Sequence, residues 1–216
     1  MNTLIIDCSS GMNIYLKCGE KVFSHEDSNQ KKHSDELLLV IDKLFDDAGI
    51  TAKKIENVCV CVGPGSFTGI RVAVSIAKGL AVESNVKVFA LSNFDIYSFE
   101  NEKKYAIVLE GFSDFVYVRY FDGENSNDVC EHFADFVSKI NGELSGYKIF
   151  VQNEKLQKML IDTEISSKIA QKQTIFAFEE KISDSLSASL NQISPVYLRA
   201  SQAEIERNEK LKKENK

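Results

Sequence analysis

The residues best suited to chemistry lie in a glycine-rich stretch, residues 63–71, with the sequence GPGSFTGIR. Gly63, Gly65 and Gly69 allow positive φ or a close approach of another backbone, and Ser66 can cap the first turn of a helix. A turn of this kind at the end of a strand can serve as a ligand-binding loop. The stretch is therefore the first candidate for a functional site.

Three known motifs resemble this stretch without matching it. A P-loop requires Lys and then Ser or Thr after its last glycine, but Ile70 and Arg71 stand there. A nucleophile elbow requires glycines two positions before and after its serine, where Ser66 has Pro64 and Thr68. A dinucleotide fingerprint fits only loosely, with a proline inside it. A tight turn leading into a capped helix, with no ligand, is the simpler interpretation.

Asp7, Ser9 and Ser10 form a second candidate site, directly after the first apolar run of the chain. A carboxylate and hydroxyls in a hairpin can hold hydrated magnesium and the phosphates of a nucleotide. An acidic residue that merely ends a strand is the more common case. If this chain binds a nucleotide, we expect these three residues and the glycines at positions 63, 65 and 69 to bind it.

A metal site is not predicted. His33 stands where a helix begins, but a helical two-histidine site needs a second histidine four residues later, where the chain has Leu37. We expect His33 to act as a helix cap instead. His25 and His132 have no partner at ligand spacing, and the Cys-x-Cys sequence at 59–61 lies in an apolar run without further ligands.

The glycine turn joins two elements that must both be buried. Residues 58–62 are apolar at every position, which is typical of a central strand covered on both faces. A helix is predicted from Thr68 to Glu83, with one apolar face that packs on the sheet. Its second flank consists of Val72, Ile76 and Gly79. The polar stripe beside that flank consists of Arg71, Ser75 and Lys78. A helix that is apolar nearly all round requires a second cover besides its own core.

The helix predicted over residues 34–48 has a similarly broad apolar face. Ile41 belongs to its core stripe, and Leu38 and Phe45 flank it and widen the apolar arc. This width exceeds what one contact with a sheet requires. We therefore expect the outer flanks of both helices to meet a partner.

The order strand, strand, strand, helix, strand, helix occurs twice, once before residue 85 and again after residue 104. We expect an α/β fold of two lobes, residues 1–100 and 101–194, followed by a C-terminal segment with a charged tail, 195–216. Ser92 or Asn93 is expected to start a short helix through about Phe99, and another helix is expected over residues 183–191.

The composition is that of a globular chain, with 44% hydrophobic and 27% charged residues among 216. No apolar run approaches the about 20 residues that span a bilayer, and the start of the chain lacks a signal-peptide pattern, so a cytoplasmic protein is expected. Five cysteines, an odd number, mostly lie in apolar runs and are expected to be reduced. The net charge of −6 argues against a free-standing nucleic-acid binder.

Several segments together resemble the bacterial TsaB (YeaZ) family, a subunit of the machinery that makes threonylcarbamoyladenosine beside the anticodon of tRNA. They are residues 6–9, 33–35, 63–71, 77–81 and 195–199. The resemblance implies an actin-like, ribonuclease-H-like fold and a non-catalytic subunit that binds no cofactor tightly by itself. It also allows ATP or ADP at an interface shared with a partner. At 110–113 the chain reads EGFS, where these relatives usually have a segment like Asp-Ala-Arg.

The resemblance also implies partners. TsaB pairs with its metal-dependent paralogue TsaD through the two helices of the first lobe, works with TsaE, forms a homodimer without TsaD, and meets tRNA only through the complex. Leu37 is consistent with loss of the two-histidine motif that TsaD carries. The interface residues implied here are Leu38, Ile41, Phe45, Arg71, Val72, Ser75, Ile76 and Gly79. The alternatives are an actin-like ATPase or small-molecule kinase and, less favoured, a dinucleotide-binding oxidoreductase.

Overall fold

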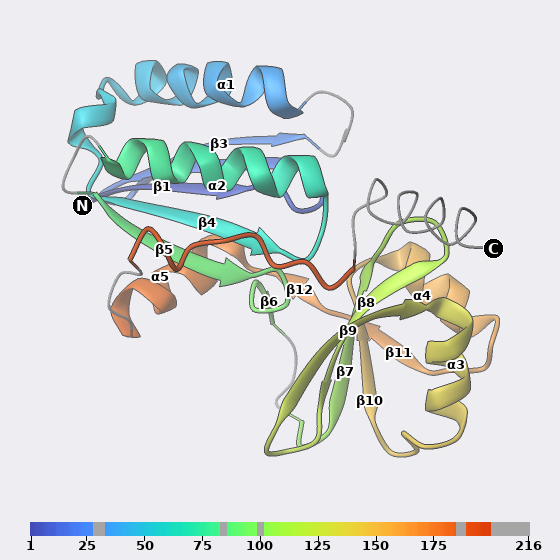
Figure 1. Ribbon diagram of the computed structural model, residues 1–216. Coiled ribbons are helices and arrows are strands. Elements are labelled where there is room, and N and C mark those ends of the chain that lie inside the picture. Colours follow the sequence, from blue (N-terminus) through green and yellow to red (C-terminus); the bar gives the residue numbers. More distant parts are fainter. Residues whose placement is uncertain (28–32, 83–85, 99–101, 185–188, 200–216) are drawn as a thin grey trace, which may run out of the picture.

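The computed structural model describes residues 1–27, 33–82, 86–98, 102–184 and 189–199. These residues form two five-stranded sheets and a two-stranded sheet between them (Figure 1). The strand orders are β3-β2-β1-β4-β5 in the first sheet and β11-β10-β7-β8-β9 in the second. Each five-stranded sheet carries helices, so the chain has the two-lobed α/β architecture expected from its sequence.

The first sheet begins with three antiparallel strands, as predicted, and continues with two strands parallel to β1. The strands are β1 (Asn2–Asp7), β2 (Met12–Cys18), β3 (Lys21–Asp27), β4 (Asn57–Gly63) and β5 (Lys87–Ser92). Every residue of β4 is buried, which confirms the central strand. The helices α1 (His33–Ala48) and α2 (Phe67–Val82) lie over one face of this sheet (Figure 1), with a short 3-10 helix η1 (Ala52–Lys54) after α1.

The second sheet repeats the plan of the first. Its antiparallel strands are β7 (Tyr105–Glu110), β8 (Phe115–Phe121) and β9 (Ser126–His132), and β10 (Lys148–Val151) and β11 (Ser167–Ile169) are added in parallel, with helices α3 (Phe133–Asn141) and α4 (Glu154–Ile161). Both sheets therefore place the first strand of their unit at the centre, between an antiparallel and a parallel neighbour. The predicted repeat of the order βββαβα is confirmed, and each unit ends in a further parallel strand.

One predicted helix is wrong. The segment after β5 forms turns and then β6 (Tyr97–Ser98), which pairs with β12 (Gln171–Lys172). Asn93, expected to start a helix, instead donates its backbone N–H to the Gly63 carbonyl at 2.7 Å. The sequence also missed α5 (Thr174–Asp184), in which Ile175, Phe178 and Ile182 have the helical spacing of core residues. Of the helix expected over 183–191, residues 185–188 lie outside the described residues and 189–191 are not helical.

The chain returns to the first lobe after completing the second. Helix α5 packs against β1 and β5, on the face opposite α1 and α2 (Figure 1). Phe178 joins Ile5, Cys59 and Phe89 there in a core that also includes residues of the second sheet. The expected lobe 101–194 therefore contains a helix that packs on the first sheet, and the first lobe is built from both ends of the described chain.

Candidate functional site

The glycine turn packs directly on the hairpin that follows β1. The Ser66 N–H donates to the Ser9 carbonyl at 2.8 Å. A Cβ atom on Gly65 would lie 2.3 Å from the same carbonyl oxygen, and one on Gly69 would lie 2.3 Å from the carbonyl oxygen of Cys8. The two stretches predicted as binding loops are thus brought together, but the space that their glycines leave is filled by backbone of this chain.

The rest of the turn is also held by bonds within the chain. The Asn93 side-chain amide donates to the Pro64 carbonyl at 2.9 Å. Gly63 has a positive φ of 107°, and a Cβ there would lie 3.0 Å from the Val196 carbonyl oxygen. Ser66 Oγ accepts from the Gly69 N–H at 3.3 Å and caps α2, as expected from the sequence. These contacts support the ligand-free interpretation of the turn.

Asp7 lies at the carboxyl end of β1 and is fully buried. Its Oδ1 accepts hydrogen bonds from Ser9, from N–H at 3.0 Å and from Oγ at 2.6 Å. Its Oδ2 lies 2.8 Å from the Lys172 ammonium nitrogen, on β12. Ser10, the third residue expected here, is partly exposed. The carboxylate thus has a cationic partner from residues far along the chain, which the sequence did not indicate.

The surroundings of Asp7 are poor in water. Burial raises the pKa of the Cys8 thiol to about 12, with the negative charge of Asp7 as a second cause. The same two causes raise the pKa of Cys61 and of Tyr97 well above their ordinary values. A carboxylate in such surroundings requires a partner that compensates for its lost hydration.

A C-terminal strap, residues 193–199, crosses the start of α2. The Val196 N–H donates to the Val62 carbonyl of β4 at 2.7 Å. The ring of Tyr197 stacks on Phe67, and Arg71 Nε donates to the Tyr197 hydroxyl oxygen at 2.6 Å. Arg71, expected at a partner interface or beside a bound anion, therefore holds the strap. Sequence reasoning gave Tyr197 no separate role.

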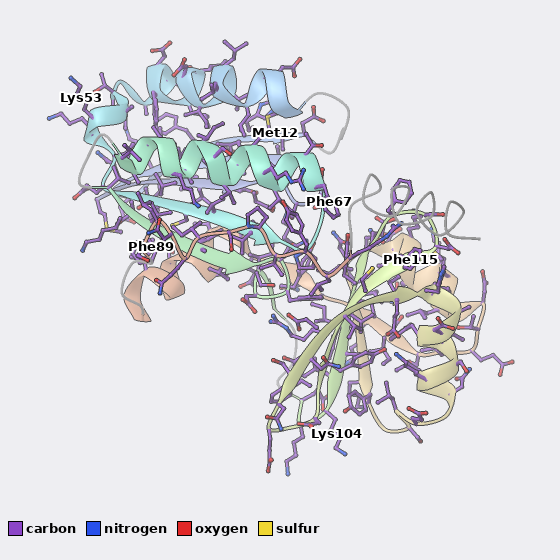
Figure 2. The ribbon with its side chains drawn as sticks, in the orientation of Figure 1. Met12, Lys53, Phe67, Phe89, Lys104 and Phe115 are labelled. Carbon is purple, nitrogen blue, oxygen red and sulfur yellow. The ribbon has the colours of Figure 1, made fainter. Side chains whose placement is uncertain are left out.

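The strap continues onto the second lobe. The Arg199 guanidinium lies 4.5 Å from the ring centre of Phe115 and 5.5 Å from that of Phe112. Figure 2 shows Phe67 at the start of α2 and Phe115 at the near end of the second sheet, with the strap running between the two lobes. This short segment therefore contacts both halves of the molecule.

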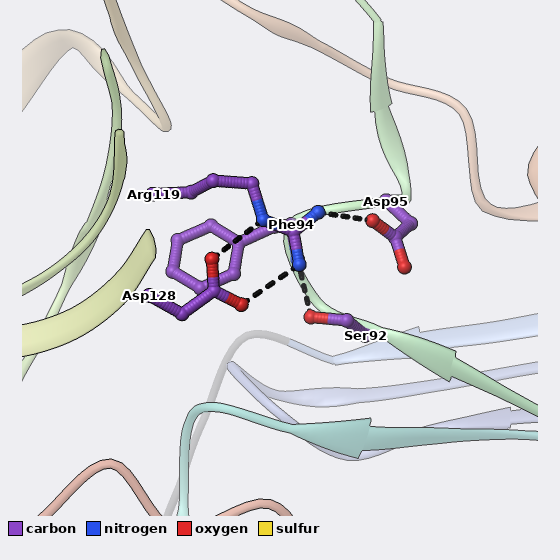
Figure 3. Close-up of polar contacts among 5 residues, drawn as sticks. All are labelled: Ser92, Phe94, Asp95, Arg119 and Asp128. Atoms are coloured by element: carbon purple, nitrogen blue, oxygen red, sulfur yellow. Dashed lines mark hydrogen bonds and ion pairs between the residues drawn. The ribbon is translucent and has the colours of Figure 1, made fainter. Parts of the chain in front are cut away.

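A second contact between the lobes centres on Arg119 of β8 (Figure 3). Its Nε and Nη2 donate to the two carboxylate oxygens of Asp128 at 2.7 and 2.8 Å, and its Nη1 pairs with Asp95 in the turn after β5. The guanidinium also lies 4.8 Å from the ring centre of Phe94. The ion pair with Asp128 lies within the second sheet, whereas Asp95 and Phe94 belong to the first lobe.

The outward faces of α1 and α2 carry apolar side chains. Leu38, Leu39 and Val82 are 57%, 67% and 73% exposed. Among the other expected interface residues, Ser75 and Gly79 are exposed, and Val72 and Ile76 are partly buried against the core. The expectation that Ile41 and Phe45 belong to the interface is wrong, because these residues are 2% and 6% exposed and lie in the core of the first lobe. Turned toward the sheet, their side chains offer no free surface.

No group of three or more metal-ligating side chains occurs among the described residues. Leu37, where the sequence lacks a second histidine, is fully buried in the core of the first lobe. The side chain of His33, expected to cap α1, lies outside the described part. Within that part, no helix is long and apolar enough to cross a membrane.

The repeated βββαβα order and the shared strand order of the sheets define an actin-like, ribonuclease-H-like fold of two lobes. Two structures from Pseudomonas aeruginosa have this fold: a protein described as similar to peptidase YeaZ, with a TM-score of 0.71 at 19% identity, and YeaZ itself, with a TM-score of 0.68 at 18% identity. The alignments cover 92% and 91% of this chain and 99% and 100% of those chains.

Residues 21–207 match the family described as "TsaD: tRNA N6-adenosine threonylcarbamoyltransferase", and the chain belongs to this family. Among its relatives is the tRNA threonylcarbamoyladenosine biosynthesis protein TsaB of Buchnera aphidicola, which is 31% identical over 49% of this chain and 48% of that protein. The TsaB protein of Haemophilus influenzae is 33% identical over 38% of each chain. The chain thus spans half or less of the length of these relatives. The resemblance to TsaB and YeaZ is confirmed.

Proposed function

We propose that this chain is a non-catalytic scaffold that acts with TsaD and TsaE in the transfer of a threonylcarbamoyl group to the adenosine beside the anticodon of tRNA. The names of its relatives support the pathway. The observation that carries the scaffold role is the exposure of Leu38, Leu39 and Val82 on the two helices of the first lobe. Leu38 and Leu39 are neighbours near the start of α1, and adjacent exposed apolar side chains on a helix are a feature of interaction surfaces.

The occupied loops support the same proposal. The glycine turn is filled by the backbone of Cys8 and Ser9, and the Asp7 carboxylate faces Lys172. Both features disfavour the alternative, an actin-like ATPase or small-molecule kinase that holds a nucleotide at these residues. If ATP or ADP is used, we place it at an interface with a partner subunit. We further propose a cytoplasmic location, contact with tRNA only through the complex, and a homodimer in the absence of TsaD.

The scaffold proposal is tested by Leu38→Asp together with Leu39→Asp. Both side chains are exposed, so the double variant should keep the melting temperature of the parent and lose co-purification with TsaD. Ile161→Asp is the matched control, because Ile161 is 61% exposed but lies on α4 of the second lobe. Retained binding by the double variant, or equal loss in the control, would contradict an interface on α1.

The pathway is tested separately in cells. Depletion of the protein should lower threonylcarbamoyladenosine in digested tRNA measured by mass spectrometry, and the wild-type gene should restore it. An undiminished level would overturn the assignment. The isolated chain should neither bind nor hydrolyse ATP in the presence of Mg²⁺. Measurable turnover that is lost in Asp7→Asn would instead favour the ATPase or kinase.

A further inference from the structure

Within the described part of the chain, two short segments link the lobes in addition to the strap. The first crossing, residues 93–98, follows β5 and leads toward β7. The second crossing, residues 170–173, follows β11 and leads into α5. Segments of this kind are where two-lobed proteins bend, because a few residues at the end of an element absorb the change in backbone angles. The freedom of these two crossings to bend therefore decides whether the lobes move.

The two crossings are hydrogen-bonded to each other. β6 of the first crossing and β12 of the second form an antiparallel ladder, which lies where the two lobes meet (Figure 1). The Gln173 N–H donates to the Ile96 carbonyl at 2.8 Å and extends this pairing. On the other side, the Ala170 N–H donates to the Val151 carbonyl of β10, also at 2.8 Å. A bend at either crossing would break these bonds.

The crossings are also buried among apolar side chains. Phe94, Ile96 and Tyr97 of the first crossing are 2%, 0% and 7% exposed, and Ala170 of the second is 3% exposed. All four belong to one cluster of buried side chains, here called the shared core, which also includes residues of β1, β4 and β5 in the first sheet and of β7, β8 and β10 in the second. Lobes that share a large apolar interface are not expected to move independently.

The alternation of side chains along the strands explains how both sheets contribute to the shared core. In β4, Val60 packs with residues of α1 and α2, whereas its neighbour Cys59 lies in the shared core. In β8, Val118 packs with residues of α3 and α4, whereas its neighbour Tyr117 lies in the shared core. Each sheet thus packs its own helices on one face and the other lobe on the opposite face.

The first crossing has a polar attachment to the second sheet as well. Arg119 of β8 is held by Asp128 of β9, and the same guanidinium pairs with Asp95 and lies over the ring of Phe94 (Figure 3). Both Phe94 and Asp95 lie in the turn that leads into β6. The part of the first crossing that would rotate in a hinge is therefore fixed to the opposite lobe.

We propose that the two crossings form a locked hinge, which makes the two lobes one rigid unit that neither opens a cleft nor unfolds one lobe at a time. Helix α1 and the second sheet then keep a fixed relative position in the free protein. A partner that contacts both lobes meets a surface already in its bound arrangement, which lowers the entropic cost of association. This inference goes beyond the scaffold role and does not depend on it.

The first test is native-state hydrogen exchange of the wild-type full chain, followed by mass spectrometry at urea concentrations below the unfolding transition. Peptides that cover the two crossings should exchange as slowly as peptides from β4 and with the same dependence on urea, because both open only when the whole molecule unfolds. A hinge would open locally. Exchange at the crossings that is about 100-fold faster than in β4 and insensitive to urea would therefore overturn the proposal.

The second test follows each lobe separately in the full chain, which contains no tryptophan. Phe23→Trp on β3 and Phe133→Trp on α3 place one reporter in each lobe, because these two rings are partly buried against the cores of the first and the second lobe. Val118→Ala is then added to each reporter chain, since Val118 is fully buried in the second lobe outside the shared core. It should lower the urea midpoint of tryptophan fluorescence by the same amount at both reporters. Val60→Ala, the matched variant in the first lobe, should also shift both reporters equally.

A shift confined to one reporter would contradict the locked hinge, because it would show that one lobe unfolds without the other. A Val118→Ala chain that does not fold is equally informative. The reporter in the first lobe must then lose its transition together with the reporter in the second, and a transition that survives at Phe23→Trp would overturn the proposal. All measurements use the isolated chain, so their failure leaves the tRNA assignment intact, and failure of that assignment leaves the locked hinge unaffected.

Discussion

The ring of Tyr197 lies nearly parallel to the ring of Phe67, with 4.7 Å between ring centres and 6° between planes. Arg71 lies against both rings, 5.2 Å from the centre of Tyr197 and 5.5 Å from that of Phe67. Two residues 130 positions apart in sequence thus share one cation, at the start of the helix that the glycine turn leads into. Tyr197 is 42% exposed and is held by this cluster, whereas Ile193 at the start of the strap is 1% exposed in the core of the first lobe.

Tyr197→Ala should lower the free energy of unfolding by about 1–2 kcal/mol, because both the ring stacking and the contact with Arg71 are lost. Tyr197→Phe is the matched control, since it retains the stacking and loses only the hydrogen bond from Arg71. Its cost should be below about 1 kcal/mol. Urea unfolding measures the free energy of unfolding of both variants. Equal costs would mean that the hydrogen bond, and not the stacking, holds the strap.

Two glycines of α2 should respond to alanine in opposite directions. A Cβ on Gly69 would lie 2.3 Å from the Cys8 carbonyl oxygen, and this overlap should cost about 1–3 kcal/mol or more. Gly79 has nothing within 4 Å, so Gly79→Ala should stabilise the helix by about 0.5–1 kcal/mol. Thermal unfolding of the two variants distinguishes the predictions. A tolerated Gly69→Ala would show that the turn can move away from the hairpin.

Arg119→Met should be strongly destabilising, by about 3 kcal/mol, because it leaves the Asp128 carboxylate without its bidentate partner. The Arg119 side chain is only 18% exposed. Lys43→Met is the control, because Lys43 makes an exposed ion pair with Asp47 within α1 and its loss should cost less than about 0.5 kcal/mol. Denaturant titration gives the free energy of unfolding of Arg119→Met and of Lys43→Met for this comparison. A similar, small effect of both would show that the Arg119–Asp128 pair contributes no more to stability than an exposed ion pair.

Stability should fall at alkaline pH because of the buried thiols. The pKa of Cys8 rises from 9.0 to about 12 on folding, so the folded state keeps a proton that the unfolded state loses. This contribution is complete below pH 9.0 and is lost as the pH rises toward 12. The urea midpoint of the wild type should be lower above pH 9.0 than at neutral pH. The midpoint of Cys8→Ala should fall less over the same pH range. Identical slopes would assign the loss to other groups, such as Cys59 and Cys61.

The sequence predicted the elements whose pattern is local. The uniformly apolar strand β4, the three antiparallel strands before α1 and the second βββαβα unit follow from periodicity and turn residues. The capped turn at Ser66 also followed, because a hydroxyl before a helix has a local partner. The boundaries of α1 and α2 differ from expectation by about one residue.

The remaining features depend on contacts between distant residues. Asn93 and Ser92 are good helix-start residues, but the Gly63 carbonyl takes the Asn93 N–H and draws the segment into turns. No pattern near Lys172 shows that it faces Asp7, and none near Arg71 shows that it faces Tyr197. The outward flank assigned to Phe45 was wrong, because α1 is rotated so that this residue also packs in the core, where it is 6% exposed. Helical spacing alone cannot fix that rotation.

The return of the chain to the first lobe has a consequence for the order of synthesis. Helix α5 and the strap at 193–199 are made after the whole second sheet, yet the strap bonds to β4 and α5 packs on β1 and β5. On the ribosome, the first sheet therefore emerges early with one face still uncovered. Until α5 has left the exit tunnel, the face of the first sheet that it covers is an exposed apolar surface, and it is a place where a chaperone could bind.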